Sequence, residues 1–218
     1  MKTRLLKIKV SPDLGSVSAV YICPAKPSCI LTLAHGAGAG MNHSFMTDLA
    51  QALADRNIAT LRFNFVFTQN EKKRPDTPAV AHQVIAAAIA QAKKLLPSAA
   101  LFAAGKSFGG RMTSQYLSQH DDAAVQGLIF FGFPLHPIGK PSTERAEHLK
   151  AIKKPLFFLQ GTRDELAKWD LIEPVCNSLA TATLVKIEGA DHAFKAGKRD
   201  VISELAAHTQ SWTQKVIG

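Results

Sequence analysis

The sequence is poor in cysteine and has no long hydrophobic run. Its three cysteines, Cys23, Cys29 and Cys176, form no close metal-ligand pair, and their odd number leaves at least one thiol without a disulfide partner. This excludes a disulfide-rich scaffold and favours a reducing, cytoplasmic compartment. Lys7 and Lys9 interrupt any apolar segment of a secretion signal. The longest apolar runs, such as Leu128 to Phe133, fall far short of the ~20 residues of a membrane-spanning helix, so we expect neither secretion nor membrane insertion.

Acidic residues are the minority among the charged ones. The chain has 26 Lys and Arg against 17 Asp and Glu, a formal net charge of +9 that attracts polyanions. The basic residues are scattered, and tight runs such as Lys72 to Arg74 and Lys153 to Lys154 carry no RNA-binding or amphipathic pattern. The sequence favours a solvated basic surface over a specific nucleic-acid site, and a preference for acidic substrates stays open.

The length of the chain bounds its domain count. With 218 residues, of which 46% are hydrophobic, the chain can bury one sizeable core but is short for two. We predict one domain over residues 1–218. The oligomeric state does not follow from the sequence.

Apolar runs alternate with segments of helical spacing along most of the chain. The first two runs, Leu5 to Val10 and Val17 to Cys23, flank a proline- and glycine-bearing turn and predict an antiparallel hairpin. The further predicted strands are Cys29–Ala34, Ile58–Phe63, Ala100–Ala104, Val125–Phe131, Pro155–Gln160 and Ala182–Ile187. The predicted helices are Ser44–Asp55, Ala79–Leu96, Ser107–Gln119, Ser142–Ile152, Leu166–Leu179 and Arg199–Val216.

This alternation predicts an α/β fold. Strands joined by helices of this length form a mainly parallel, doubly wound sheet with helices on both faces, because such crossovers are right-handed. Ligands bind such sheets at the loops that leave the carboxyl ends of the strands. We therefore look for the functional residues on those loops.

A candidate nucleophile lies directly after one apolar strand and directly before a helix. Residues 105–110 read Gly-Lys-Ser-Phe-Gly-Gly and contain the G-x-S-x-G pattern with Ser107 at its centre. A sharp strand-to-helix turn exposes such a serine at the helix N-terminus, where free N–H groups favour negative charge. An ordinary helix N-cap serine explains the same residues without catalysis.

A base and an acid follow in the chain order that this chemistry needs. His192 lies after the last predicted strand, and Asp164 follows the strand before it. Glu165 is the fallback acid, and Asp191 is disfavoured because adjacent side chains in a tight loop diverge. The other histidines on predicted helices are expected at the solvated surface: His82, His120, His148 and His208.

A glycine-rich loop, residues 35–40, follows the first buried strand and predicts an oxyanion hole. Acyl transfer needs N–H donors for the tetrahedral oxyanion, and we assign them to the backbone of Ala37 and Phe108. The loop lacks the lysine and the glycine spacing of phosphate-binding loops. The chemistry requires no cofactor, and no metal-binding cluster is visible.

Four residues near these positions are predicted to contact the substrate. They are His35 and Gly36 in the glycine-rich loop, Lys106 beside the serine, and Phe133, which lies after a predicted strand. Two alternatives stay open for Lys106, which either favours an anionic substrate or points into solvent. Phe133 belongs to a set of apolar residues that either line an acyl pocket or belong to the core, the others being Phe65, Phe67, Phe108 and Leu135.

These motifs together resemble the α/β-hydrolase superfamily over about residues 17–218. The small size is similar to dienelactone-hydrolase-like and other cap-less serine hydrolases. Residues 61–65 and 105–112 also resemble a bacterial group related to the hydrolase-like domain of a chromatin acetyltransferase complex subunit. Dienelactone hydrolases themselves use a cysteine nucleophile, so Ser107 argues against that reaction. Only one short helix is predicted between Phe133 and Lys154, where many hydrolases insert a lid, so we expect an open site.

Two functions are consistent with this reading. The first is a serine hydrolase, a carboxylesterase or thioesterase, that cleaves a small ester through a Ser107–His192–Asp164 triad and an acyl-enzyme. The alternative is a non-catalytic interaction module that keeps the fold. The three triad candidates favour the enzyme.

Overall fold

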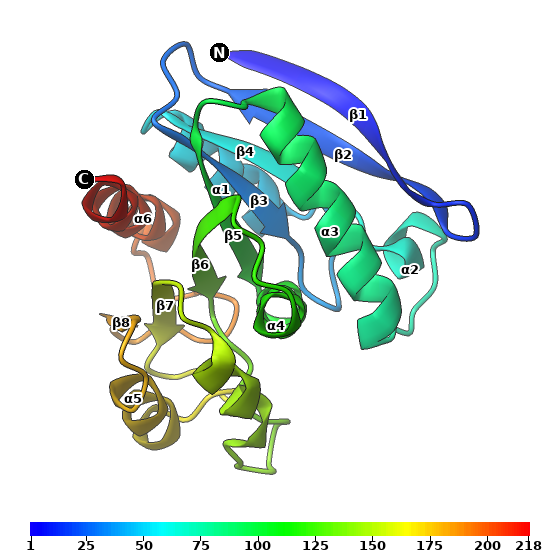
Figure 1. Ribbon diagram of the computed structural model, residues 1–218. Coiled ribbons are helices and arrows are strands. Elements are labelled where there is room, and N and C mark those ends of the chain that lie inside the picture. The colour runs from blue at the N-terminus through cyan, green and yellow to red at the C-terminus, as the bar shows by residue number, and fades with distance from the viewer.

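The computed structural model describes residues 1–218 and contains one eight-stranded sheet with the strand order β1-β2-β4-β3-β5-β6-β7-β8 (Figure 1). The strands are β1 (Lys2–Ser11), β2 (Gly15–Cys23), β3 (Cys29–Ala34), β4 (Ile58–Phe63), β5 (Ala100–Lys106), β6 (Val125–Phe131), β7 (Leu156–Gly161) and β8 (Ala182–Ile187). The helices are α1 (Ser44–Ala54), α2 (Val66–Gln69), α3 (Pro78–Leu95), α4 (Phe108–Gln119), the 3₁₀ helix η1 (Glu144–Ala151), α5 (Trp169–Asn177) and α6 (Val201–Ile217).

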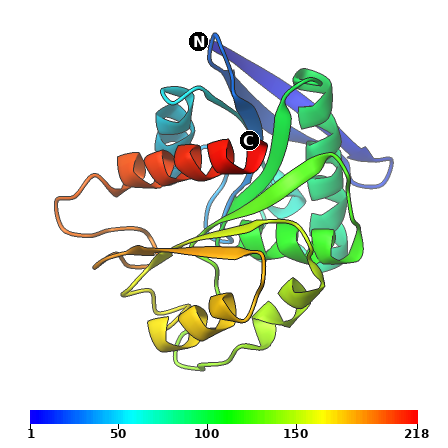
Figure 2. The ribbon, with the colours of Figure 1, turned by 60° about the vertical axis from the view of Figure 1, so that its left-hand side comes forward.

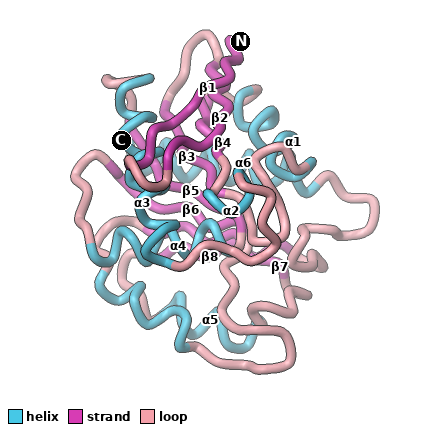
Figure 3. The backbone as a smooth tube through the Cα atoms, turned by 90° about the vertical axis from the view of Figure 1, so that its right-hand side faces the viewer, coloured by secondary structure: helices cyan, strands magenta, loops and turns pink.

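The predicted hairpin and the predicted parallel sheet are both present. β1 pairs with β2 antiparallel, β2 pairs with β4 antiparallel, and every pair from β4 to β8 is parallel. Figure 3 shows the strands side by side through the middle of the molecule, with helices around them. The doubly wound α/β class is therefore confirmed.

Helices cover both faces of the sheet, because successive apolar side chains of its central strands point to opposite faces and both faces must be buried. On β5, Leu101 and Ala103 join the core under α3, α4 and α5, whereas Phe102 and Ala104 join the core under α1 and α6. Figure 2 shows α6 on one side of the strands and α5 with η1 on the other. A strand that is buried on both faces is apolar at most of its positions, which explains the nearly continuous hydrophobic runs of the sequence.

The predicted boundaries hold within a few residues, with three differences. β5 runs to Lys106, so the strand ends one residue before the serine. α5 starts at Trp169 instead of Leu166, because the preceding residues form a turn around Asp164. The short helix α2 lies just before the polar loop that leads to α3 and was not predicted.

The structure bears on two predictions, that no helix spans a membrane and that no lid covers the site. No helix combines the length and the apolar character needed to cross a membrane. Between β6 and β7 the chain forms only the short η1 and its connections, so no lid domain covers the carboxyl ends of the strands. The fold is consistent with a cap-less α/β hydrolase architecture.

Candidate active site

Ser107 occupies the sharp turn between β5 and α4. Its backbone has φ 51° and ψ −117°, a conformation that L-residues rarely adopt and that neighbouring structure must hold. Two glycines permit this turn. A Cβ at Gly105 would lie 2.4 Å from the Gly110 nitrogen, and a Cβ at Gly109 would lie 2.5 Å from the Ala34 oxygen. Glycine is required at both positions because the backbones approach too closely for any side chain.

His192 reaches this serine from the loop between β8 and α6. Its Nε2 lies 2.8 Å from Ser107 Oγ, and its imidazole is partly exposed. His192 sits in a turn that is closed by a hydrogen bond from the Phe194 N–H to the Asp191 carbonyl. Phe194 itself has a positive φ of 61°. The loop thus directs the imidazole back over the end of β5.

Asp164 lies on the far side of the imidazole, in the turn after β7. Its Oδ2 is 2.7 Å from His192 Nδ1, and its side chain is 1% exposed. Oδ1 accepts a hydrogen bond of 2.8 Å from the Leu166 N–H. Neither alternative acid takes this place, since Glu165 is exposed and Asp191 accepts a hydrogen bond from the Lys195 N–H.

Gln160 connects this carboxylate to the sheet, and the sequence analysis did not identify it. Its Nε2 donates to Asp164 Oδ2 at 2.6 Å, and its Oε1 accepts from the Phe133 N–H at 2.8 Å. The side chain is fully buried with both amide atoms bonded, so it fixes the position of the carboxylate. The signal for it was a polar residue at the end of the otherwise apolar run Leu156–Leu159.

The two predicted oxyanion donors lie beside the serine. The N–H groups of Ala37 and Phe108 donate to no other group of the protein. Phe108 is the first residue of α4, where the helix N-terminus adds favourable potential for an anion. The glycine loop is close, because a Cβ at Gly36 would lie 3.6 Å from Ser107 Cβ. Both N–H groups are therefore available for a developing negative charge.

His35 does not reach the cavity next to the serine, which corrects its prediction as a substrate contact. Its side chain is fully buried; Nδ1 donates to the Gly36 carbonyl at 2.8 Å, and Nε2 accepts from the Phe65 N–H at 3.1 Å. Burial lowers the pKa of His35 to about 4, so the ring is neutral at pH 7. His35 instead fixes the shape of the loop that carries Ala37.

Phe133, like His35, does not lie where it was predicted to contact the substrate. It is 1% exposed and packs against Phe130, Phe158 and His148, and it does not line the cavity. The core interpretation therefore holds for this residue and for its companions, which are all buried and lie outside the cavity lining: Phe65, Phe67, Phe108 and Leu135.

A cavity of about 450 Å³ opens next to Ser107 and His192. Gly36 and Lys106, both predicted to contact the substrate, line it together with Ala37 and Leu166. Sequence reasoning missed its other wall, which the start of α1 provides through His43, Phe45 and Met46. The signal was available, because α1 follows the glycine-rich loop and must begin at the carboxyl edge of the sheet.

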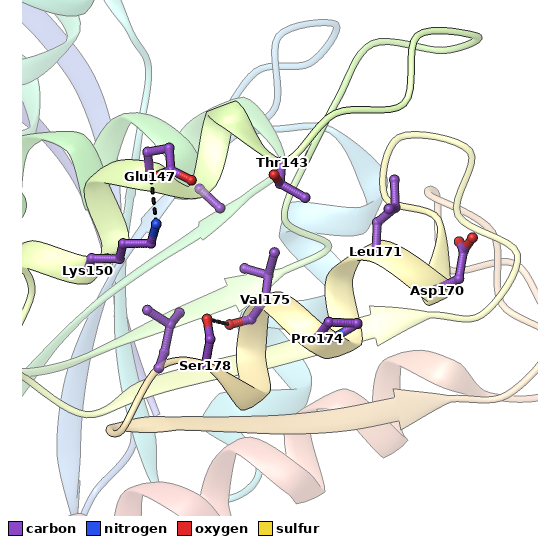
Figure 4. Close-up of a pocket in the computed structure, with 10 residues that line it drawn as sticks. Thr143, Glu147, Lys150, Asp170, Leu171, Pro174, Val175 and Ser178 are labelled. Carbon is purple, nitrogen blue, oxygen red and sulfur yellow. Dashed lines mark hydrogen bonds and ion pairs between the residues drawn. The ribbon is translucent and has the colours of Figure 1, made fainter.

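A second cavity of about 300 Å³ lies between η1 and α5, away from these residues (Figure 4). Glu147 and Lys150 of η1 face Leu171 and Val175 of α5 across it. No nucleophile–base pair lines this cavity. The structure also has no group of three or more His, Cys, Asp or Glu side chains that could hold a metal ion.

The doubly wound sheet, the serine at a strained elbow, and the histidine and aspartate in line with it place the molecule among α/β hydrolases. Residues 27–217 match the family model described as alpha/beta hydrolase domain, and the chain belongs to this family.

Solved structures of similar architecture agree with this assignment. Dienelactone hydrolase from Anabaena variabilis has a TM-score of 0.80 at 17% identity, over 98% of this chain and 97% of that one. XC6422 from Xanthomonas campestris, described as a serine hydrolase without lid, has a TM-score of 0.74 at 20% identity, over 97% and 95%. An esterase domain from Rhodothermus marinus has a TM-score of 0.76 at 15% identity and full coverage of both chains. At these identities the likeness shows the fold.

Proposed function

We propose that the protein is a serine hydrolase that cleaves a small carboxylic ester or thioester through an acyl-enzyme on Ser107. The observation that carries this proposal is the unbroken line of hydrogen bonds from Asp164 through His192 to Ser107, at 2.7 and 2.8 Å. The line ends at a strained turn beside two free N–H groups. Such an arrangement has nucleophile, base, orienting acid and oxyanion donors in one place.

The chemistry follows from these positions. His192 Nε2 accepts the Ser107 hydroxyl proton while Oγ attacks the ester carbonyl carbon, and the carbonyl oxygen becomes an oxyanion that faces the N–H groups of Ala37 and Phe108. The protonated imidazole then gives its proton to the leaving alcohol or thiol as the acyl-enzyme forms. Water, deprotonated by the same imidazole, cleaves the acyl-enzyme and regenerates the serine. Asp164 holds Nδ1–H throughout and stabilises the imidazolium.

The cavity supports a small or accessible substrate. Its volume of about 450 Å³ suits a short acyl or alcohol group, and Phe45 and Met46 give one wall an apolar character. The chain inserts no lid domain that could enclose a long lipid chain over the site. The likeness to an esterase domain and to a lidless serine hydrolase supports the same class.

The test is the hydrolysis of 4-nitrophenyl acetate, butyrate and decanoate. We expect a burst of about one equivalent of nitrophenol per Ser107, followed by turnover that falls with acyl length. The Ser107→Ala variant should show no burst. Equal turnover by wild type and Ser107→Ala would contradict the proposal, as would a folded wild type that leaves all three esters intact.

The interaction-module alternative is not favoured, because it gives no reason for an aligned and buried carboxylate behind the histidine. It predicts an intact fold without an acyl-enzyme, so the same assay separates the two. The cytoplasmic location and the absence of specific nucleic-acid binding remain predictions from the sequence.

A further inference from the structure

The side chain of Lys106 runs from the end of β5 to the loop that carries His192. Its Nζ donates to the His192 carbonyl at 2.5 Å. The ammonium also lies over two aromatic rings, 5.1 Å from the centroid of Phe194 and 5.7 Å from that of Phe45. Those two rings stack on each other at 5.7 Å. The residue next to the nucleophile in sequence therefore ends at the backbone of the proposed base.

The loop around His192 needs such a contact. It has no helix or strand between Ile187 and Val201, and its turn contains the positive φ of Phe194. The Ala190 carbonyl accepts from the Arg163 N–H at 2.9 Å, which anchors the loop before the turn. No backbone N–H donates to the His192 carbonyl, so Lys106 is its hydrogen-bond partner.

The head of Lys106 is not placed to receive a substrate. The residue is 8% exposed, and its Cγ lies 3.9 Å from where a Cβ of Gly36 would be, so the aliphatic stem faces the glycine loop and the cavity. The ammonium lies deeper, and a Cβ at Gly132 would come within 3.1 Å of it. A substrate carboxylate would have to displace the two aromatic rings or the His192 carbonyl to reach it.

The electrostatics of the ammonium are consistent with a fixed contact. Burial lowers the pKa of Lys106 to about 8, while the charges of Asp164 and Asp191 oppose this and raise it. A buried charge is retained only where specific partners compensate its lost hydration. Here the partners are the carbonyl, the two rings and the two carboxylates, all of which belong to the His192 loop, to α1 or to the turn after β7.

We propose that Lys106 is a positioning residue, which holds the turn of His192 so that its Nε2 faces Ser107. This inference rests on the proposed function. It replaces the view of Lys106 as a ligand for an anionic substrate, since the same side chain cannot hold the His192 carbonyl and a substrate carboxylate without moving.

The first test compares Lys106→Met with wild type on two matched esters, methyl 4-acetoxybenzoate and 4-acetoxybenzoate, which differ by one negative charge. Misplacing a catalytic group by about 1 Å costs ~10²-fold, so we expect kcat to fall ~10- to 100-fold on both esters with little change in KM. A rise in KM confined to the anionic ester would overturn the proposal in favour of substrate binding. Unchanged kinetics on both esters would also overturn it.

Control variants separate positioning from loss of fold. Lys198 lies on the same loop, is exposed and makes no side-chain hydrogen bond, so Lys198→Met should match wild type. In Lys106→Cys, alkylation with 2-bromoethylamine restores an ammonium at nearly the original length, and we expect it to restore most of kcat. Wild type treated with the same reagent controls for modification of the native thiols. Failure of this rescue in a folded protein would contradict the proposal.

A spectroscopic measurement keeps the inference independent of the ester assay. The His192 Nδ1–H bonded to Asp164 should give a downfield proton resonance in wild type and in Lys198→Met. We expect this resonance to shift or broaden in Lys106→Met, because the turn is released. If wild type and Lys198→Met both lack esterase activity, the proposed function fails while this resonance still tests Lys106. An unchanged resonance in Lys106→Met would refute the positioning role.

Discussion

The molecule contains two serine–histidine pairs with the same separation, and only one of them is built like an active site. Ser107 Oγ lies 2.8 Å from His192 Nε2, and Ser114 Oγ lies 2.8 Å from His148 Nε2. Both serines belong to the segment that starts at the elbow and continues through α4. The distance between hydroxyl and imidazole therefore cannot by itself identify a nucleophile.

The surroundings of the two pairs differ in three ways. Ser114 is fully buried inside α4, and its hydroxyl donates to the Arg111 carbonyl at 3.0 Å, so its proton is directed to an atom that cannot take it up. His148 has no carboxylate partner, and burial with the charge of Arg111 lowers its pKa to about 4. Ser107 lines a cavity, whereas Ser114 has no exposed surface. The Ser114–His148 pair links η1 to α4. The Ser107–His192 pair instead has an adjacent cavity, a strained serine backbone and a buried carboxylate behind the histidine.

The largest expected effect is the contrast between removing the two hydroxyls. Ser107→Ala should lower kcat for ester hydrolysis by ~10⁶-fold, because loss of the nucleophile disables the whole triad. Ser114→Ala should leave kcat within a few-fold of wild type. Steady-state rates with 4-nitrophenyl acetate measure both. A large loss of kcat in a folded Ser114→Ala variant would show that the two serine–histidine pairs do not differ in this way.

The next effect concerns the carboxylate that only the first pair has. Asp164→Asn should lower kcat by ~10⁴-fold, because the amide no longer holds His192 in the right tautomer. Glu165→Gln, the exposed neighbour, is the matched control and should change kcat less than about threefold. The ester assay over pH 6 to 9 measures both variants. If Glu165→Gln proved the more damaging change, the assignment of the acid would be wrong.

Acid should destabilise the fold through two histidines, the buried His35 and the partly buried His148, whose pKa values are lowered to about 4. An unfolded histidine titrates near 6.5, so between pH 6.5 and 4 the unfolded chain binds protons that the folded chain does not, and stability falls as the pH falls. For His35 the full effect is ~3 kcal/mol.

Urea unfolding at pH 7.5 and pH 4.5 measures this loss. His148→Gln should lose less stability between these two pH values than wild type, because one of the two groups is removed. An equal loss in wild type and variant would show that His148 is already protonated or exposed in the folded protein.

The smallest expected effect is on stability at neutral pH. Ser114→Ala leaves the His148 nitrogen without its partner, which should lower the free energy of unfolding by ~1–3 kcal/mol. Ser118→Ala is the matched control on the same helix; its hydroxyl also donates to a backbone carbonyl, but no histidine depends on it. A smaller loss in Ser114→Ala than in Ser118→Ala would contradict the fastening role of the second pair.

Much of the fold was predictable because the parallel strands are mainly apolar. The strands Cys29–Ala34, Ile58–Phe63, Val125–Phe131 and Ala182–Ile187 agree residue for residue with their predicted limits. The elbow, the acid and the histidine were placed on the correct loops, because the carboxyl ends of parallel strands share one edge. The sequence therefore predicted which residues lie along that edge and in which order.

Contacts between distant segments were not predictable in the same way. His148 was expected at the solvated surface, yet it is partly buried and bonded to Ser114, because η1 packs on α4 far from it in sequence. His35 was expected at the substrate, but Phe65 of the next strand–helix connection takes its second nitrogen. Neither partner follows from a local pattern, since hydrogen bonds of this kind depend on how segments far apart in the sequence pack together.

We propose that Ser107, and not Ser114, carries the activated hydroxyl of the protein. The most direct measurement is labelling with a fluorophosphonate probe, followed by mass spectrometry of the peptides that contain the two serines. We expect one label per chain, on Ser107, retained in Ser114→Ala and lost in Ser107→Ala and His192→Ala. A label on Ser114, or no label on folded wild-type protein, would contradict it.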